Sequence, residues 1–272
     1  MVGGLFAVLR RAGPERAADI CAWLARKIGP RLREQKIGRA QLRAAFPEHD
    51  DAWVEATLIA AWDNLGRVVG EYVHLDRIWD YDPARPGVGR IETDAEPALL
   101  FAAHLANWEL PAVAAQRNGL PSAALYRTPN NKAIARDVLR MRSGVMGELI
   151  PAGPAAPVRM MEALDAGLHL GMLVDQRFGR GPKIRFLGRT ATANPLLARL
   201  ARRFDCPIHG ARAIRLPGNR FRLELTEAIT LPRDARGVVD VEAATQHVND
   251  IVEGWIREYP GQWLWQHRRW RM

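Results

Sequence analysis

The chain has 272 residues, 48% of them hydrophobic, and carries a formal net charge of +9. This length and apolar content fit one large α/β domain or two small ones and exclude a chain that is disordered throughout. The positive charge favours an anionic partner such as nucleic acid, an acidic membrane surface, or an acidic protein or phosphorylated ligand.

Two cysteines, Cys21 and Cys206, are too few for a disulfide framework or a cysteine metal site, and they fit a reducing compartment. No stretch of 18 apolar residues occurs, so the sequence predicts no ordinary membrane span. The phosphate-binding patterns GxxxxGK[ST] and GxGxxG after a strand are missing, as is the hydrolase pattern GxSxG. We therefore expect no nucleotide cofactor and no metal.

Residues 1–80 are predicted to be mainly helical. Apolar residues between positions 5 and 28 are interspersed with arginine and lysine, a pattern typical of an amphipathic helix in a membrane interface. The alternative is a helical hairpin packed on the rest of the protein, with its basic face in water. We expect residues 1–80 to form a helical region at a membrane surface, and residues 81–97 to form a loop with a short strand.

A short apolar run, residues 99–103, ends in His104, and Glu109 follows five residues later. The run predicts a buried strand, and the next residues predict the start of a helix, with Asn107 as its cap and Gly119 near its end. His104 would then stand at the carboxyl end of a strand, where α/β sheets place their chemistry.

A neutral imidazole in that position can take a proton from a hydroxyl group. The carboxylate of Glu109, just inside the helix, can fold back onto the other ring nitrogen and hold the tautomer. A serine or cysteine nucleophile is not needed if the substrate supplies the hydroxyl. The spacing alone is weak, because seven histidines and 30 acidic residues give about one such pair by chance.

Two further predicted strands end in polar residues. Residues 122–126 lead to Arg127, which suits a phosphate clamp or a surface ion pair. Residues 168–174 lead to Asp175, which suits a base, an orienting acid or a partner for an arginine. Arg180 follows between two glycines, where the backbone can approach an anion, although an ordinary glycine-rich turn has the same pattern.

The remaining chain predicts further strands and helices before an unusual tail. The strands are expected at 148–151, 184–187, 208–214 and 221–225, and the helices at 157–167, 195–204 and 240–258. In the tail, residues 260–271, tryptophan alternates with arginine. This suits lipid headgroups, stacking on bases, or a tail packed on the core.

Five segments, in this order, resemble the lipid A biosynthesis acyltransferases, the lauroyl and myristoyl late acyltransferases. They are His-Leu-Ala-Asn-Trp-Glu at 104–109, Tyr-Arg-x-x-Asn-Asn at 126–131, Asp-Gln-x-x-Gly-Arg-Gly at 175–181, Phe-Leu-Gly-Arg at 186–189, and Gln-Trp-Leu-Trp-x-His-Arg-Arg-Trp at 262–270. The resemblance implies an α/β fold like that of the glycerolphosphate acyltransferases. This is a mixed, mostly parallel central sheet flanked by helices, with residues 81–272 as one core behind the helical N-terminal region.

The resemblance also implies acyl transfer from acyl carrier protein to a hydroxyl of a lipid A precursor. His104 matches the general base of the family and Glu109 its orienting acid. The residues expected to bind substrate are Arg127, Asn131, Asp175, Gln176 and Arg180. No cofactor is implied.

The implied partners are an acidic carrier protein, a phosphorylated glycolipid and a membrane surface, and not nucleic acid. The basic surface suits the first two. The implied location is the cytoplasmic face of the inner membrane, held peripherally or monotopically. Other family-related enzymes with an H-x4-[DE] core act on other glycolipids, so another acceptor, or a non-catalytic lipid-binding role, is the alternative. A basic nucleic-acid-binding protein is the alternative from another class.

Overall fold

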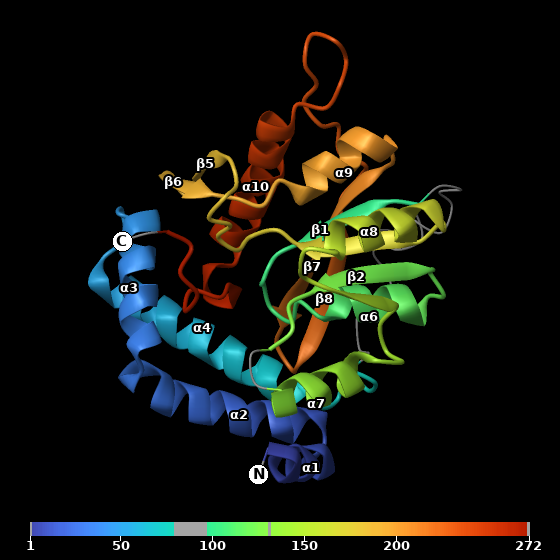
Figure 1. The fold of residues 1–272 in the computed structure, drawn as a ribbon. Helices are drawn as coiled ribbons and strands as arrows, with labels where there is room; N and C mark the ends of the chain where they lie inside the picture. Colours follow the sequence, from blue (N-terminus) through green and yellow to red (C-terminus); the bar gives the residue numbers. More distant parts are fainter. Residues whose placement is uncertain (1, 79–96, 130–131, 271–272) are drawn as a thin grey trace.

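The computed structural model describes residues 2–78, 97–129 and 132–270. At its centre lies a six-stranded sheet with helices on both faces, and a group of N-terminal helices lies along one side of it (Figure 1). The strand order is β3-β2-β4-β1-β7-β8. Every neighbouring pair is parallel except β7 and β8, which form an antiparallel hairpin. The predicted mixed, mostly parallel α/β architecture with a helical N-terminal region is confirmed.

The strands occur close to where the apolar runs predicted them. Those of the main sheet are β1 (Leu99–Ala102), β2 (Ser122–Tyr126), β3 (Glu148–Pro151), β4 (His169–Leu173), β7 (Ile208–Leu216) and β8 (Arg220–Leu225). A separate antiparallel hairpin consists of β5 (Lys183–Phe186) and β6 (Arg189–Thr192). The predicted loop and short strand at 81–97 lie almost wholly outside the described residues.

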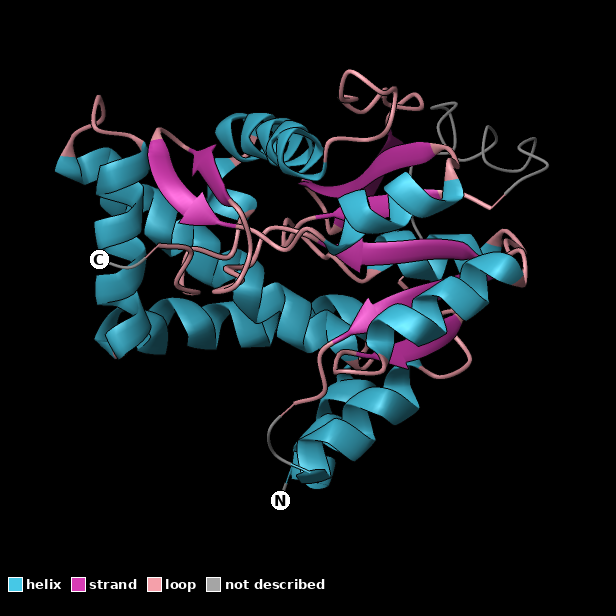
Figure 2. Cartoon of the chain, turned by 45° about the horizontal axis from the view of Figure 1, so that its top comes forward, coloured by secondary structure: helices cyan, strands magenta, loops and turns pink. Residues whose placement is uncertain are grey.

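The chain reverses direction within the sheet, and this decides which face each helix covers. It moves from β1 past β4 to β2, and later from β3 past β2 to β4. Because such crossovers are right-handed, the two moves place their helices on opposite faces. One face carries α6 (Leu110–Arg117), and the other carries α8 (Ala156–Asp165), α9 (Leu196–Phe204) and α10 (Val241–Glu258) (Figures 1 and 2). The helix α7 (Lys132–Arg142) lies below the sheet, next to the N-terminal helices (Figure 1).

The two faces of the sheet are buried to different degrees. On the side of α8, α9 and α10, Phe101 and Leu170 are fully buried in the main core. On the side of α6, alternate residues such as Leu100, Ala102 and Gly171 remain partly accessible although they lie in central strands. Side chains alternate between faces along a strand, so the face beneath α6 is incompletely filled.

The N-terminal region consists of α1 (Val2–Ala12), α2 (Pro14–Ile28), α3 (Arg33–Ala45) and α4 (Asp51–Tyr72). Figure 1 shows α2 and α4 side by side below the sheet. A Cβ on Gly66 of α4 would lie 2.5 Å from the carbonyl oxygen of Cys21, so glycine permits this close approach. Among the described helices, none combines the length and hydrophobicity needed to cross a membrane.

The helix after His104 begins later than predicted. It starts at Leu110, with Glu109 at the N-cap position and Pro111 in the first turn. The expected cap, Asn107, lies before the helix in a turn, where its Oδ1 accepts from the backbone N–H of Glu109 at 3.1 Å. Its Nδ2 donates to the buried carboxylate of Glu71 on α4 at 2.9 Å. Asn107 therefore keeps a local bond before the helix and adds a long-range bond to α4.

Candidate active site

The polar residues predicted at three strand ends lie at one edge of the sheet. His104 follows β1, Arg127 follows β2, and Asp175 and Gln176 follow β4, and these three strands are parallel. His104, Arg127 and Gln176 line one cavity of about 430 Å³. The parallel strands thus bring together residues that lie far apart in the sequence, at the edge where α/β sheets place ligands.

At the mouth of this cavity, the imidazole of His104 meets the carboxylate of Asp175. Nδ1 of His104 lies 2.8 Å from Oδ1 of Asp175, and the backbone N–H of His104 donates to Oδ2 at 2.8 Å. The indole N–H of Trp263 donates to the same Oδ2 at 2.7 Å. The carboxylate is 2% exposed and the imidazole 12% exposed. Both carboxylate oxygens of Asp175 therefore have hydrogen-bond partners, whereas part of the imidazole surface remains accessible to solvent.

The pKa of Asp175 determines which proton the imidazole carries. Burial alone would raise this pKa, but the charge of His104 and the hydrogen bonds from His104 and Trp263 lower it to about 2. An ionised carboxylate only accepts hydrogen bonds, so Nδ1 of His104 must donate. In the neutral ring, Nε2 then carries the lone pair, and the amide of Gln176 lies 3.1 Å from it. The imidazole is thus held in the tautomer that a general base needs.

The expected contact between Glu109 and the ring of His104 does not form. Glu109 is buried and accepts two hydrogen bonds from the guanidinium of Arg142, one of them at 3.0 Å. The guanidinium also lies over the rings of Tyr72 and Tyr126, 5.6 and 5.7 Å from their centroids. A buried carboxylate requires a charged partner, and Arg142 of α7 is that partner. Asp175 takes the orienting position that the sequence assigned to Glu109.

The turn that carries His104 is held in place by hydrogen bonds to the tail, residues 260–271, and to α4. Ala106 has a φ of 48°, a left-handed conformation that a non-glycine residue adopts only when its surroundings impose it. Its N–H donates to the carbonyl of Gln262 at 2.9 Å, and its carbonyl accepts from Asn64 at 3.1 Å. The backbone N–H of Leu264 donates to the carbonyl of His104 at 3.2 Å. These hydrogen bonds fix the orientation of the His104 imidazole.

The tryptophans of the tail are part of the core. Trp263, Trp265 and Trp270 are 3%, 0% and 4% exposed, and Arg269 is 1% exposed. Of the three possibilities that the sequence left open, packing on the core is the one observed. The contact of Trp263 with Asp175 was missed, because a tail residue gives no local signal of a partner 88 positions earlier.

The cavity extends from His104 along the incompletely filled face of the sheet. Its floor includes Ala102, Ala124 and Gly171 in the middle of the sheet, and its far end includes Ser122 and His169. The helix α6 covers it with small side chains, Pro111, Ala112 and Ala115. Small residues on both the sheet and the helix leave a long space between them. Such a space fits an apolar chain whose reactive end lies at His104.

The other predicted site residues divide into three groups. Arg127 lies exposed at the mouth of the cavity, and Gln176 contacts His104. Arg180 lies exposed in the turn after β4 and does not line the cavity. Asn131 lies outside the described residues. The sequence missed Trp108, whose ring centroid lies 5.1 Å from that of His104.

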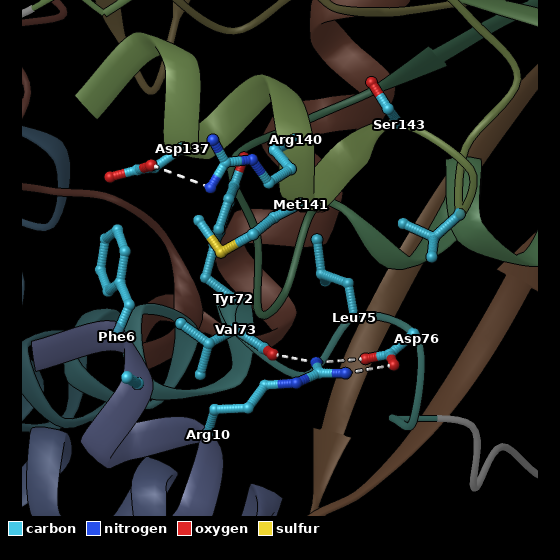
Figure 3. Close-up of a pocket in the computed structure, with 12 residues that line it drawn as sticks. Phe6, Arg10, Tyr72, Val73, Leu75, Asp76, Asp137, Arg140, Met141 and Ser143 are labelled. Atoms are coloured by element: carbon cyan, nitrogen blue, oxygen red, sulfur yellow. Dashed lines mark hydrogen bonds and ion pairs between the residues drawn. The ribbon is translucent and has the colours of Figure 1, made fainter. Parts of the chain in front are cut away.

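A second cavity, of about 450 Å³, lies between α1, the end of α4 and α7 (Figure 3). Phe6 and Met141 form part of its apolar wall. At its edge Arg10 pairs with Asp76, with Nη1 2.6 Å from Oδ1. None of the described residues that the sequence predicted for the site lines this cavity. The predicted site residues that line a cavity therefore line the first one.

An α/β sheet that ends in a histidine–aspartate pair beside a long apolar cavity defines a candidate enzyme that acts on an apolar chain. Over residues 1–272 the chain matches the family model described as bacterial lipid A biosynthesis acyltransferase. The chain belongs to this family of acyltransferases, as the five sequence segments indicated. A comparison with curated proteins finds no match.

Proposed function

We propose that the protein transfers a fatty acyl chain from acyl carrier protein to a hydroxyl group of a lipid A precursor. The observation that carries this proposal is the His104–Asp175 pair at the mouth of the apolar cavity. The acyl chain would lie in the cavity with its thioester next to His104. Membership of the lipid A acyltransferase family supports the choice of acceptor.

The reaction begins when Nε2 of His104 takes the proton of the acceptor hydroxyl. The hydroxyl takes the place of the Gln176 amide, which lies 3.1 Å from Nε2. The acceptor oxygen attacks the thioester carbonyl, and Asp175 stabilises the imidazolium that forms. The carbon–sulfur bond then breaks, the sulfur takes the proton from His104, and the carrier protein leaves as its thiol. The general base is worth about 10² to 10⁴ in rate.

The negative charge on the carbonyl oxygen needs donors at the cavity mouth. Arg127 lines this mouth with an exposed guanidinium, and backbone N–H groups are the alternative donors. One such donor is typically worth about 3–4 kcal/mol of transition-state stabilisation. Arg177 also lines the cavity, so the entrance is basic. A basic entrance suits the phosphates of the acceptor and the acidic surface of a carrier protein.

The outer face of α1 and α2 suits contact with a membrane that holds the acceptor. Its exposed apolar side chains are Leu5, Val8, Ile20, Trp23, Leu24 and Ile28. On α2 they recur at helical spacing, so they form one stripe, and Arg16 and Lys27 are exposed on the same helix. We place this stripe in the interface of the cytoplasmic face of the inner membrane, with the protein bound peripherally or monotopically.

The proposal is tested with the purified full chain, a panel of acyl carrier proteins loaded with different chains, and a tetra-acylated lipid A precursor. Mass spectrometry of the glycolipid reports the gain of one acyl chain. His104→Ala should abolish most of this gain. His49→Ala is the matched control, because His49 is an exposed histidine stacked on Trp53.

No transfer by the wild-type protein from any donor would reject the proposed reaction. Transfer to a different glycolipid would retain the chemistry and replace the acceptor. Binding of the glycolipid that is equal in the wild type and in His104→Ala, without transfer from any donor, would indicate a lipid-binding role instead.

A further inference from the structure

Gly171 lies at the middle of the candidate acyl cavity, in the centre of β4. Its direct neighbours across the sheet are Leu100 on β1 and Ala124 on β2. Paired residues on parallel strands point to the same face, so these three positions form one row under α6. We propose that Gly171, with Ala124 beside it, sets the length of acyl chain that the enzyme accepts. This inference rests on the proposed function and names a determinant of its donor specificity.

The row divides the cavity into two parts. On the side of His104 lies a row with Ala102 and Leu173, which are paired to each other. On the far side lies the row that pairs Ser122 with His169, at the opposite edge of the sheet. An acyl chain with its thioester at His104 must pass the middle row to reach the far part. The size of the side chains in that row therefore decides whether the far part can be used.

Neither the backbone nor the packing requires glycine at position 171. Its φ is not in the left-handed region. A Cβ built on it would meet only the carbonyl oxygen of Ala123, at 3.9 Å, an ordinary contact. By contrast, a Cβ on Gly210 of β7 would lie 2.8 Å from the rings of Phe101 and Trp255. Gly210 is needed for packing, whereas the missing side chain of Gly171 leaves free space.

Free space at this position is unfavourable unless a ligand fills it. Glycine in a strand is destabilising relative to alanine, and protein interiors are normally close-packed. A glycine facing a small side chain, Ala124, under a helix of small side chains creates a gap that the fold itself does not use. The chain of the acyl donor is the occupant of that gap, because the cavity is apolar and leads to the His104–Asp175 pair.

The test compares Gly171→Ala and Gly171→Leu with the wild type across carrier-protein donors of increasing saturated chain length. Gly171→Leu should shift the preferred donor to shorter chains. It should lower kcat/KM for the longest donors, relative to the shortest, by about 10-fold or more, the typical effect of one methylene that no longer fits. Gly171→Ala should give a smaller shift of the same sign. Ala124→Leu should act like Gly171→Leu, because it narrows the same row from β2.

Gly254→Leu is the matched control. It makes the same chemical change at an exposed glycine of α10 with nothing within 4 Å of its Cβ, and its donor profile should equal that of the wild type. The melting temperature should be equal or higher in Gly171→Ala, since the new methyl group fills space. A donor profile of Gly171→Leu that equals the wild type would overturn the inference. An equal loss of kcat/KM with all donors in Gly171→Leu, together with a lower melting temperature, would also overturn the inference.

A second readout separates this inference from the proposed reaction. The thermal shift produced by free saturated fatty acids of increasing length needs no transfer step. If the wild type transfers no acyl group but long fatty acids stabilise it and not Gly171→Leu, the cavity assignment stands and the proposed reaction fails. If fatty acids of all lengths stabilise both proteins equally, the assignment of Gly171 is wrong.

Discussion

Asp175 lies 71 residues after His104 in the chain, yet its Oδ1 is 2.8 Å from Nδ1 of the imidazole. Glu109, five residues after His104, pairs with Arg142 instead. The two carboxylates therefore have different physical tasks. One holds the candidate base in its tautomer, and the other neutralises a partly buried arginine in the wall of the cavity.

The low pKa of Asp175 predicts an acid-dependent loss of stability. Its folded-state pKa of about 2 lies below its ordinary value of 3.8, so ionisation of this group stabilises the fold above about pH 4. This contribution, about 2 kcal/mol, should be lost as the pH falls from about 4 towards 2. Urea unfolding at several pH values should show a smaller acid-dependent loss in Asp175→Asn than in the wild type. Equal losses in the two proteins would contradict the assignment.

The Glu109–Arg142 pair should behave as a coupled buried ion pair. Either Glu109→Leu or Arg142→Met alone leaves one buried charge without its partner, which typically costs about 3–5 kcal/mol. The double variant should be less destabilised than the sum of the single variants, because no charge is then left unpaired. Chemical denaturation of the four proteins measures this coupling. Additive effects would mean that the pair contributes nothing as a pair.

Trp263 should affect turnover more than substrate binding, because it positions Asp175 and does not line the cavity. Trp263→Phe keeps most of the ring and removes the indole N–H. Loss of a hydrogen bond to a charged group should lower kcat about tenfold and leave KM nearly unchanged. Steady-state kinetics measure kcat and KM separately, and Trp53→Phe, away from the site, is the control. A raised KM with an unchanged kcat would assign Trp263 to binding.

The apolar stripe of α2 should decide binding to membranes. Trp23 is 53% exposed, so Trp23→Glu should leave folding intact and weaken co-sedimentation with anionic phospholipid vesicles. Val158→Glu is the control, because Val158 is 52% exposed but lies on α8, away from α1 and α2. Equal loss of binding in the two variants, or no loss in Trp23→Glu, would remove α2 from the membrane contact.

The sequence predicted most strands and the rim of the site. Residues 122–126 and 148–151 form strands with the predicted bounds, because short apolar runs between loop residues leave few alternatives. His104 and Arg127 lie at one edge of the sheet because their strands are parallel. The ends of strands can be predicted from a sequence even when the pairing of the strands cannot. The last helix begins one residue from its predicted start, where Asp240 caps it by accepting from the N–H groups of Glu242 and Ala243.

Long-range partners could not be predicted in the same way. Glu109 was chosen for His104 because it is near in sequence, whereas strand order, which places β4 next to β1, decides the partner. Asp175 was recognised as a possible orienting acid, but nothing local distinguished that role from the others. The cavity was also hidden, because it arises from small residues on β1, β2, β4 and α6 that meet only in the folded chain.

The most direct test of whether Asp175 or Glu109 serves His104 compares the acyl-transfer rates of Asp175→Asn and Glu109→Gln at saturating donor and acceptor. We predict that Asp175→Asn lowers kcat by about 10³ to 10⁴, as expected when a histidine base loses its orienting carboxylate. Glu109→Gln should retain much more of its kcat and lose stability instead. A folded Glu109→Gln without turnover, beside an Asp175→Asn with near-normal turnover, would show that Glu109 and not Asp175 serves His104.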